Sequence, residues 1–182
     1  MQTIADAIDR FTVAVGRVSA WLTLIMVVLT FVIVVLRYAF DLGWIWLQES
    51  VTWMHAAVFM LAAAYTLARD EHVRVDIFYR DMPPRRQAIV NALGTILFLV
   101  PVALFLLWSS WEYVSVSWSI REASPEAGGL VFPLPSILKS FIPLMSGLLL
   151  IQGASILIRS GLVLASREAP KETVESEHRW PG

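Results

Sequence analysis

The stretch VSAWLTLIMVVLTFVIVVL, residues Val18–Leu36, contains no Lys, Arg, Asp or Glu and decides the fold. A hydrocarbon core of about 30 Å is crossed by about 20 helical residues, so this run predicts a membrane-spanning helix. Three further uncharged apolar stretches follow, at Ser50–Ala68, Gln87–Trp111 and Ser140–Ile158. Their apolar residues are continuous and do not alternate as in barrel strands. The sequence therefore predicts an all-α integral membrane protein with four transmembrane helices.

The four predicted spans cover about residues 18–38, 49–68, 87–111 and 139–159 of one membrane domain, 1–166. Residues 167–182 are charged and lack an apolar pattern, which predicts a disordered cytoplasmic tail. A short interfacial helix is predicted within Phe40–Gln48, before the second span. Pro101 predicts a kink in the third span.

The basic residues are segregated between the connections. The N-terminal segment, the loop after the second span and the C-terminal tail together hold 11 of the 14 Lys and Arg residues. Short cytoplasmic segments are enriched in Lys and Arg, so both termini are expected in the cytoplasm. This count also supports an even number of spans.

Composition excludes several functional classes. The chain is 57% hydrophobic, which is too apolar for a soluble domain of this size. It has no cysteine, so it forms no disulfide or thiolate metal site of its own. The sequence has no basic cluster of the kind that would indicate nucleic-acid binding. No phosphate-binding loop, nucleophile–base pair or metal-ligand spacing is present, which predicts no enzymatic activity and no cofactor in this chain.

The second span carries the most informative polar pattern. Gln48, Thr52 and His55 are spaced to share one helix face, and the middle of the span is rich in alanine. Small residues allow close helix packing, so this span is expected to pack inside protein rather than to face lipid. His55 is the one ionisable side chain well inside a span. It is interpreted either as a neutral hydrogen-bonding group between helices or as part of a proton relay.

The outer loop between the third and fourth spans combines Pro and Gly with the apolar residues Leu130, Val131, Phe132 and Leu134. Such a segment is expected to dock, either on this chain's own outer surface or on a partner. Lacking transport chemistry of its own, the chain is expected to be a subunit that supports a larger partner. A free-standing tetraspan scaffold and a membrane electron-carrier subunit are the alternatives; the second is disfavoured because His55 is alone within the bilayer.

The order of several motifs resembles the small membrane subunit, DctQ-type, of tripartite ATP-independent periplasmic (TRAP) transporters. The resemblance covers about residues 10–165. Its features are the four-span layout and the motifs Arg37-Tyr38, Trp46-Leu47-Gln48-Glu49 and His72-Val73-Arg74-Val75-Asp76. The outer segments Glu122–Leu130, Lys139–Pro143 and Leu150–Gly153 resemble the mannitol, chloroaromatic and 2-oxo acid-like subgroup.

The resemblance implies a multi-pass subunit of the bacterial inner membrane, in a sodium-driven importer of an organic acid. Its implied partners are a large DctM-type membrane subunit, a periplasmic substrate-binding protein and the lipid bilayer, with sodium held by the large subunit. We expect Glu49 to pair with Arg37 or with a cation of a partner. The candidates for the partner interface are Arg37, Gln48, Glu49, Thr52, His55, Arg74 and Asp76. The candidates for docking the binding protein are Arg121, Glu122, Glu126 and Lys139.

Overall fold

The computed structural model describes residues 1–69, 79 and 81–166. Four helical segments in this part are long and apolar enough to cross a membrane, which confirms the predicted fold class. The helices are α1 (Gln2–Phe40), α2 (Ile45–Ala68), α4 (Pro84–Gly94), α5 (Val100–Ser119) and α6 (Leu134–Ala165). A π-helical turn, η1 (Thr95–Leu99), joins α4 to α5, so these two helices form one arm.

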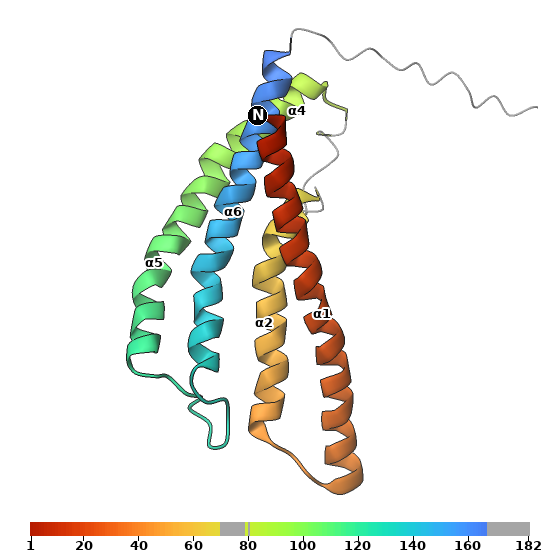
Figure 1. Ribbon diagram of the computed structural model, residues 1–182, viewed down its shortest axis with the longest axis vertical. Helices are drawn as coiled ribbons and strands as arrows, with labels where there is room; N and C mark the ends of the chain where they lie inside the picture. Colours follow the sequence, from red (N-terminus) through yellow and green to blue (C-terminus); the bar gives the residue numbers. More distant parts are fainter. Residues whose placement is uncertain (70–78, 80, 167–182) are drawn as a thin grey trace, which may run out of the picture.

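Helix α6 is the centre of the bundle. It packs against α1, α2, α4 and α5, whereas α1 packs mainly on α2. The start of α1, the arm's α4 end and the end of α6 lie at one end of the molecule (Figure 1). The α1–α2 connection and the α5–α6 loop lie at the other end (Figure 1). This arrangement agrees with an even number of spans and with both helix termini on one side.

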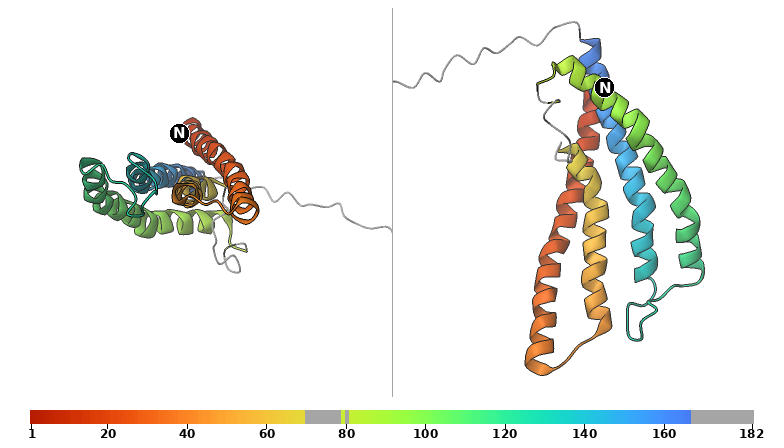
Figure 2. Two further views of the ribbon diagram at one scale, coloured as in Figure 1. Left: turned by 90° about the horizontal axis from the view of Figure 1, so that it is seen from below. Right: turned by 180° about the vertical axis from the view of Figure 1, so that it is seen from behind.

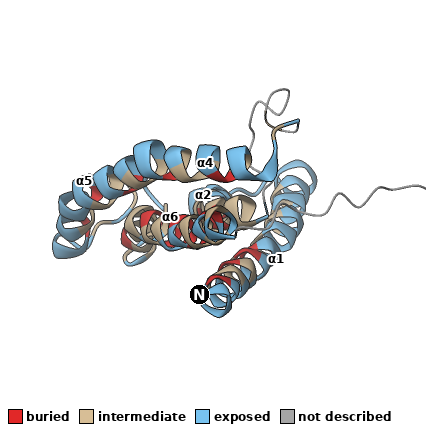
Figure 3. Cartoon of the chain, turned by 90° about the horizontal axis from the view of Figure 1, so that it is seen from above, coloured by how far each residue is buried: buried red, intermediate tan, exposed pale blue. Residues whose placement is uncertain are grey.

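The interior is built from small side chains. The largest fully buried ones are Thr12, Ser117, Ser136, Ser146 and Ser155. Most of the large apolar side chains point outward instead; Trp108, for example, is 81% exposed. Buried residues are confined to the facing sides of the helices, and the outer faces are exposed (Figure 3). A bundle in lipid is expected to pack in this way, because small residues bring backbones close while large apolar groups are solvated by acyl chains.

Helix α1 ends where the backbone turns left-handed. Asp41 has φ 54°, and the Leu42 N–H donates to the Leu36 carbonyl oxygen at 3.0 Å. This hydrogen bond closes a Schellman-type cap. Residues 41–44 are not helical, and Ile45 begins α2 directly. The separate interfacial helix predicted within Phe40–Gln48 is therefore wrong.

The helix is widened by a π-helical turn just before Pro101, where the sequence predicted a kink. In η1 the Val100 N–H reaches back five residues to the Thr95 carbonyl oxygen. Pro101 has no N–H to donate, which favours such a local departure from the α-helix. The α4–α5 arm curves along its length (Figure 2). Gly153 of α6 admits the turn, since a Cβ there would lie 2.8 Å from the Leu99 Cδ2 atom.

Helix α1 is much longer than the first predicted span. It has 39 residues, about 58 Å at about 1.5 Å per residue, and it begins at Gln2. It approaches α2 closely at Gly16, where a Cβ would lie only 2.4 Å from the Tyr65 Cβ atom. Glycine at position 16 thus allows the two backbones to meet.

Candidate partner-binding surfaces

The polar side chains of α2 form an exposed stripe. Gln48, Thr52 and His55 are all exposed, and Phe59, 71% exposed, continues the stripe by one turn. Within residues 1–69, 79 and 81–166, the side chains of Gln48, Thr52 and His55 form no hydrogen bond. We call Gln48, Thr52, His55 and Phe59 the α2 stripe.

The α2 stripe lies opposite the small-residue face. Ala57 and Ala64 are buried, and Ala57 lies two residues after His55, on the other side of the helix. The buried alanines of α2 thus pack within this chain, whereas the α2 stripe faces away from it. A polar stripe on a membrane-spanning helix finds no hydrogen-bond partner in hydrocarbon. Its chemistry therefore suits another protein helix.

Arg37 lies near the outer end of the same helix pair. It is exposed, and it forms no ion pair with any acid in the described part of the chain. It lines a shallow pocket at the α1–α2 connection, together with Asp41, Trp44 and Gln48. Arg37 thus lies beside the α2 stripe, because Gln48 belongs to the stripe and lines the same pocket.

Glu49 is bound to this chain's own outer loop. Its carboxylate accepts hydrogen bonds from the Ser124 hydroxyl at 2.5 Å and from the Leu130 N–H at 2.6 Å. Glu49 therefore does not pair with Arg37, and its pairing with a cation of a partner stays a prediction. A Cβ at Gly129 would lie 2.7 Å from the Glu49 Oε2 atom, so glycine is needed where the loop passes over the carboxylate.

The outer loop docks on this chain's own helices, which is one of the two alternatives that the sequence left open. Leu130 is buried, and Phe132 packs edge-on against Trp118 with ring centroids 5.6 Å apart. The Trp53 indole N–H donates to the Leu134 carbonyl oxygen at 2.7 Å and so ties α2 to the start of α6. These contacts fix the loop between the two helix pairs.

Two of the four predicted docking residues are paired with each other. The Lys139 ammonium group donates to the Glu122 carboxylate and also lies 4.1 Å from the centroid of the Tyr113 ring. The hydrogen bond from Lys139 holds the pKa of Glu122 below its usual range. In contrast, Arg121 and Glu126 are exposed, and their side chains form no ion pair among the described residues. Arg121 adopts a left-handed conformation, φ 50°, at the end of α5.

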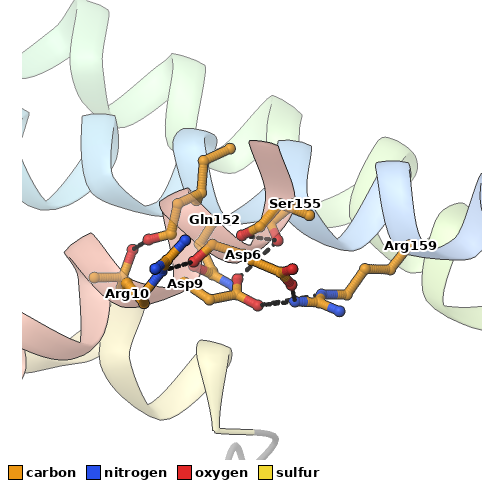
Figure 4. A network of polar contacts seen from close by, with 9 residues as sticks. Asp6, Asp9, Arg10, Gln152, Ser155 and Arg159 are labelled. Carbon is orange, nitrogen blue, oxygen red and sulfur yellow. Dashed lines mark hydrogen bonds and ion pairs between the residues drawn. The ribbon is translucent and has the colours of Figure 1, made fainter. Parts of the chain in front are cut away.

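A polar network at the opposite end joins the start of α1 to α6 (Figure 4). The Asp9 Oδ1 atom accepts hydrogen bonds from the Gln152 amide at 2.9 Å and from the Ser155 hydroxyl at 2.7 Å. The Asp9 Oδ2 atom accepts from the Arg159 guanidinium, which also donates to Asp6 at 2.7 Å. The spacing of Gln152, Ser155 and Arg159 on one face of α6 was the signal available in the sequence. Their partner, about 150 residues away, was not visible there.

The predicted residues Arg74 and Asp76 lie outside the described residues. In the part of the chain that the structure describes, no group of three or more His, Asp or Glu side chains is arranged to hold a metal ion.

Two comparisons with known proteins agree with each other. A family model described as "Tripartite ATP-independent periplasmic transporters, DctQ component" matches residues 26–161. The "C4-dicarboxylate TRAP transporter small permease protein DctQ" of Vibrio cholerae serotype O1 is 28% identical over 108 residues. That match covers 59% of this chain and 44% of the relative, so the chain is aligned to less than half of the relative's length.

Proposed function

Because this chain belongs to the DctQ family, components of tripartite ATP-independent periplasmic transporters, we propose that it is the small permease subunit of a sodium-driven importer of an organic acid. The family location, the inner membrane, agrees with the four candidate membrane spans. In this proposal the chain braces a large DctM-type subunit in the bilayer and helps to seat a periplasmic substrate-binding protein. Sodium is held by the large subunit.

The substrate class rests on two indications. The Vibrio cholerae relative is named for C4-dicarboxylates. The outer segments around Glu122–Leu130 resemble the mannitol, chloroaromatic and 2-oxo acid-like subgroup. Dicarboxylates and 2-oxo acids share a carboxylate, so we propose a carboxylate substrate that is bound by the other two components.

The α2 stripe is the observation that carries the bracing role. Its three polar residues are exposed on a membrane-spanning helix and lack hydrogen-bond partners among the described residues. Hydrogen bonds between membrane helices contribute about 0.6 kcal/mol each on average, up to about 1.7. Three such bonds to a large subunit would stabilise the complex by about 2 kcal/mol.

We expect the triple substitution Gln48→Leu, Thr52→Leu, His55→Leu to weaken the complex with the large subunit roughly 30-fold, because about 2 kcal/mol of polar contacts is removed. The measurement is recovery of the large subunit with the tagged chain in mild detergent, over a range of expression levels. Sodium-driven uptake in proteoliposomes should fall in parallel.

The matched control is Ser109→Leu, which makes the same kind of change at an exposed position of α5. It should leave recovery and uptake unchanged. If the triple variant retained the large subunit as well as the control does, the α2 stripe would not be the interface.

The second role, seating the binding protein, is proposed for Arg121 and Glu126 alone. Both are exposed on the outer loop, whereas Glu122 and Lys139 already neutralise each other. Charges at the rim of an interface act mainly on the association rate. The rigid docking of the loop on Glu49 would hold these two charges in a fixed position.

We expect Glu126→Lys to raise the binding-protein concentration needed for half-maximal uptake about tenfold at low salt, and less at high salt, where charges are screened. The measurement is uptake by the reconstituted complex against binding-protein concentration. Asp81→Lys makes the same charge change at the other end of the bundle and is the control. Equal curves for wild type and Glu126→Lys would remove the outer loop from the docking surface.

A further inference from the structure

The α2 stripe runs, at its outer end, into the shallow pocket at the α1–α2 connection. This pocket has a volume of about 320 Å³, and Arg37, Asp41, Gly43, Trp44 and Gln48 are among the residues that line it. We call it the outer pocket. The α1–α2 connection lies at the opposite end of the molecule from the start of α1 and the end of α6 (Figure 1). With both termini in the cytoplasm, the outer pocket faces the other side of the membrane.

The outer pocket contains two opposite charges that do not neutralise each other. Arg37 and Asp41 are both exposed, and no ion pair joins them although they are four residues apart. Neither side chain forms a hydrogen bond or an ion pair within residues 1–69, 79 and 81–166. Beside the hydrocarbon core, charges attract each other more strongly than in bulk water. The two charges therefore form a surface that suits a complementary pair.

The backbone holds the two charges in a fixed order. Arg37 lies in the last turn of α1, and Asp41 is the left-handed residue at which the helix ends. The cap hydrogen bond from the Leu42 N–H to the Leu36 carbonyl oxygen fixes the turn between them. A partner whose acid meets Arg37 therefore needs a base at a defined position, opposite Asp41.

The α2 stripe indicates what covers the outer pocket. Thr52 and His55 lie deeper along the same helix, where acyl chains offer no hydrogen-bond partner, so a protein segment suits them better than lipid. A helix with its side chains is about 10–12 Å wide. A helix that packs on Gln48 therefore also covers the pocket that Gln48 lines, and it keeps lipid headgroups out.

The stripe by itself does not fix the height of such a partner helix. Its side chains recur every three or four residues, so a partner displaced by one turn, about 5.4 Å, would still meet polar groups. The two unpaired charges adjoin the stripe at its outer end. A displacement by one turn would separate them from their counterparts. Charges placed in this way can set the register of two packed helices.

We propose that the outer pocket receives an acidic and a basic side chain of the large subunit, the acid at Arg37 and the base at Asp41, and that these contacts set the register of the large subunit on the α2 stripe. The inference rests on the proposed function, because the large subunit is the partner proposed for the stripe. It adds the chemistry that this partner presents at the outer membrane surface.

The test compares single charge changes with an exchange of the two charges. Arg37→Glu reverses one charge and Asp41→Asn removes the other, whereas Arg37→Asp with Asp41→Arg keeps both charges and inverts their order. Asparagine tolerates the left-handed conformation of position 41. Arginine is also accommodated in this conformation, as Arg121 shows. The measurement is recovery of the large subunit with the full tagged chain in mild detergent, over a range of expression levels.

We expect Arg37→Glu to weaken the complex at least about tenfold, because it places like charges opposite each other. Asp41→Asn should weaken it less, about threefold, since a neutral amide loses attraction without adding repulsion. The exchanged variant should be as weak as Arg37→Glu, because both charges of the partner then face like charges. The melting temperature of the isolated chain should not change in Arg37→Glu, since Arg37 has no partner among the described residues.

Arg85→Glu is the matched control for Arg37→Glu. Arg85 is an exposed arginine of α4, at the other end of the bundle, and the substitution is the same. Recovery of the large subunit should not change in this variant. An equal loss in Arg85→Glu would show that net charge, and not the outer pocket, is responsible, and the proposal would fail.

A second measurement identifies the acid of the partner directly. Arg37→Lys provides a primary amine at this position, and a carbodiimide joins an amine to a carboxyl group in contact with it, with loss of water. Peptide mass spectrometry of the treated complex should show an amide bond between position 37 and an Asp or Glu of the large subunit. A complex in which position 37 joins no carboxyl group of the large subunit would contradict the proposal.

Full recovery by the exchanged variant would also overturn the proposal, because a flexible zwitterionic headgroup accepts either order of charges and a partner with fixed charges does not. Unchanged recovery in Arg37→Glu would have the same meaning. The outcome is separable from that of the proposed function. If the triple leucine variant of the α2 stripe lost the large subunit while the pocket variants retained it, the stripe would remain the interface and only the role of the outer pocket would be refuted.

Discussion

Gly16→Val is expected to separate α1 from α2 and to lower the free energy of unfolding by about 3 kcal/mol. Even the first added carbon would lie 2.4 Å from the Tyr65 Cβ atom, which is fixed to the α2 backbone and cannot rotate away. The two helices must therefore move apart along their main contact. The measurement is thermal or detergent-induced unfolding of the full chain.

Gly161→Val is the matched control for Gly16→Val. Gly161 is also helical, but it is exposed, and a Cβ there meets nothing within 4 Å. This variant should be as stable as wild type or slightly more stable, because valine is the better helix former. Similar losses in both variants would mean that the close approach at Gly16 is not what holds α1 to α2.

Asp9→Asn is expected to cost about 2–3 kcal/mol, because one carboxylate accepts hydrogen bonds from Gln152, Ser155 and Arg159. The variant keeps the shape but loses the charge that Arg159 requires, and it directs an amide N–H group toward one of these donors. The start of α1 should detach from α6. The measurement is amide hydrogen exchange in the first four turns of α1, together with unfolding of the full chain.

Asp6→Asn is the control for Asp9→Asn, since it removes an equal charge from the same helix. The Asp6 side chain is 52% exposed, and among the described residues it pairs only with Arg159, so its loss should cost less than about 1 kcal/mol. If both variants behaved alike, general electrostatics rather than the hydrogen bonds to Asp9 would hold the end of α1.

The spans could be predicted from the sequence because uncharged runs of the right length have few alternatives in a bilayer. The start of α1 was missed because Asp6, Asp9 and Arg10 interrupt the apolar pattern. The two acidic charges are tolerated at these positions because Arg159, 150 residues after Asp9, donates hydrogen bonds to both of them. The periodicity of apolar residues and the composition indicate which residues are neighbours within one helix. They carry no information about partners so distant in the sequence.

The polar sites were predicted unevenly for the same reason. The spacing of Gln48, Thr52 and His55 correctly placed them on one face, but spacing alone could not show which side of α2 this chain covers. Glu49 was identified as important, yet its partners Ser124 and Leu130 lie 75 and 81 residues away. Those contacts depend on how the outer loop folds, which its Pro and Gly residues permit but do not specify.

The central position of α6 also determines when the helix bundle can assemble during synthesis. This helix, which joins the α1–α2 pair to the α4–α5 arm, is the last of the five to leave the ribosome. Until Leu134–Ala165 enters the bilayer, the earlier helices lack the helix against which they pack. The hydrogen bonds of Asp9 and Trp53 with α6 cannot form before then. A chain truncated before residue 134 would therefore contain the α1–α2 pair and the α4–α5 arm without the helix that packs between them, rather than a smaller complete bundle.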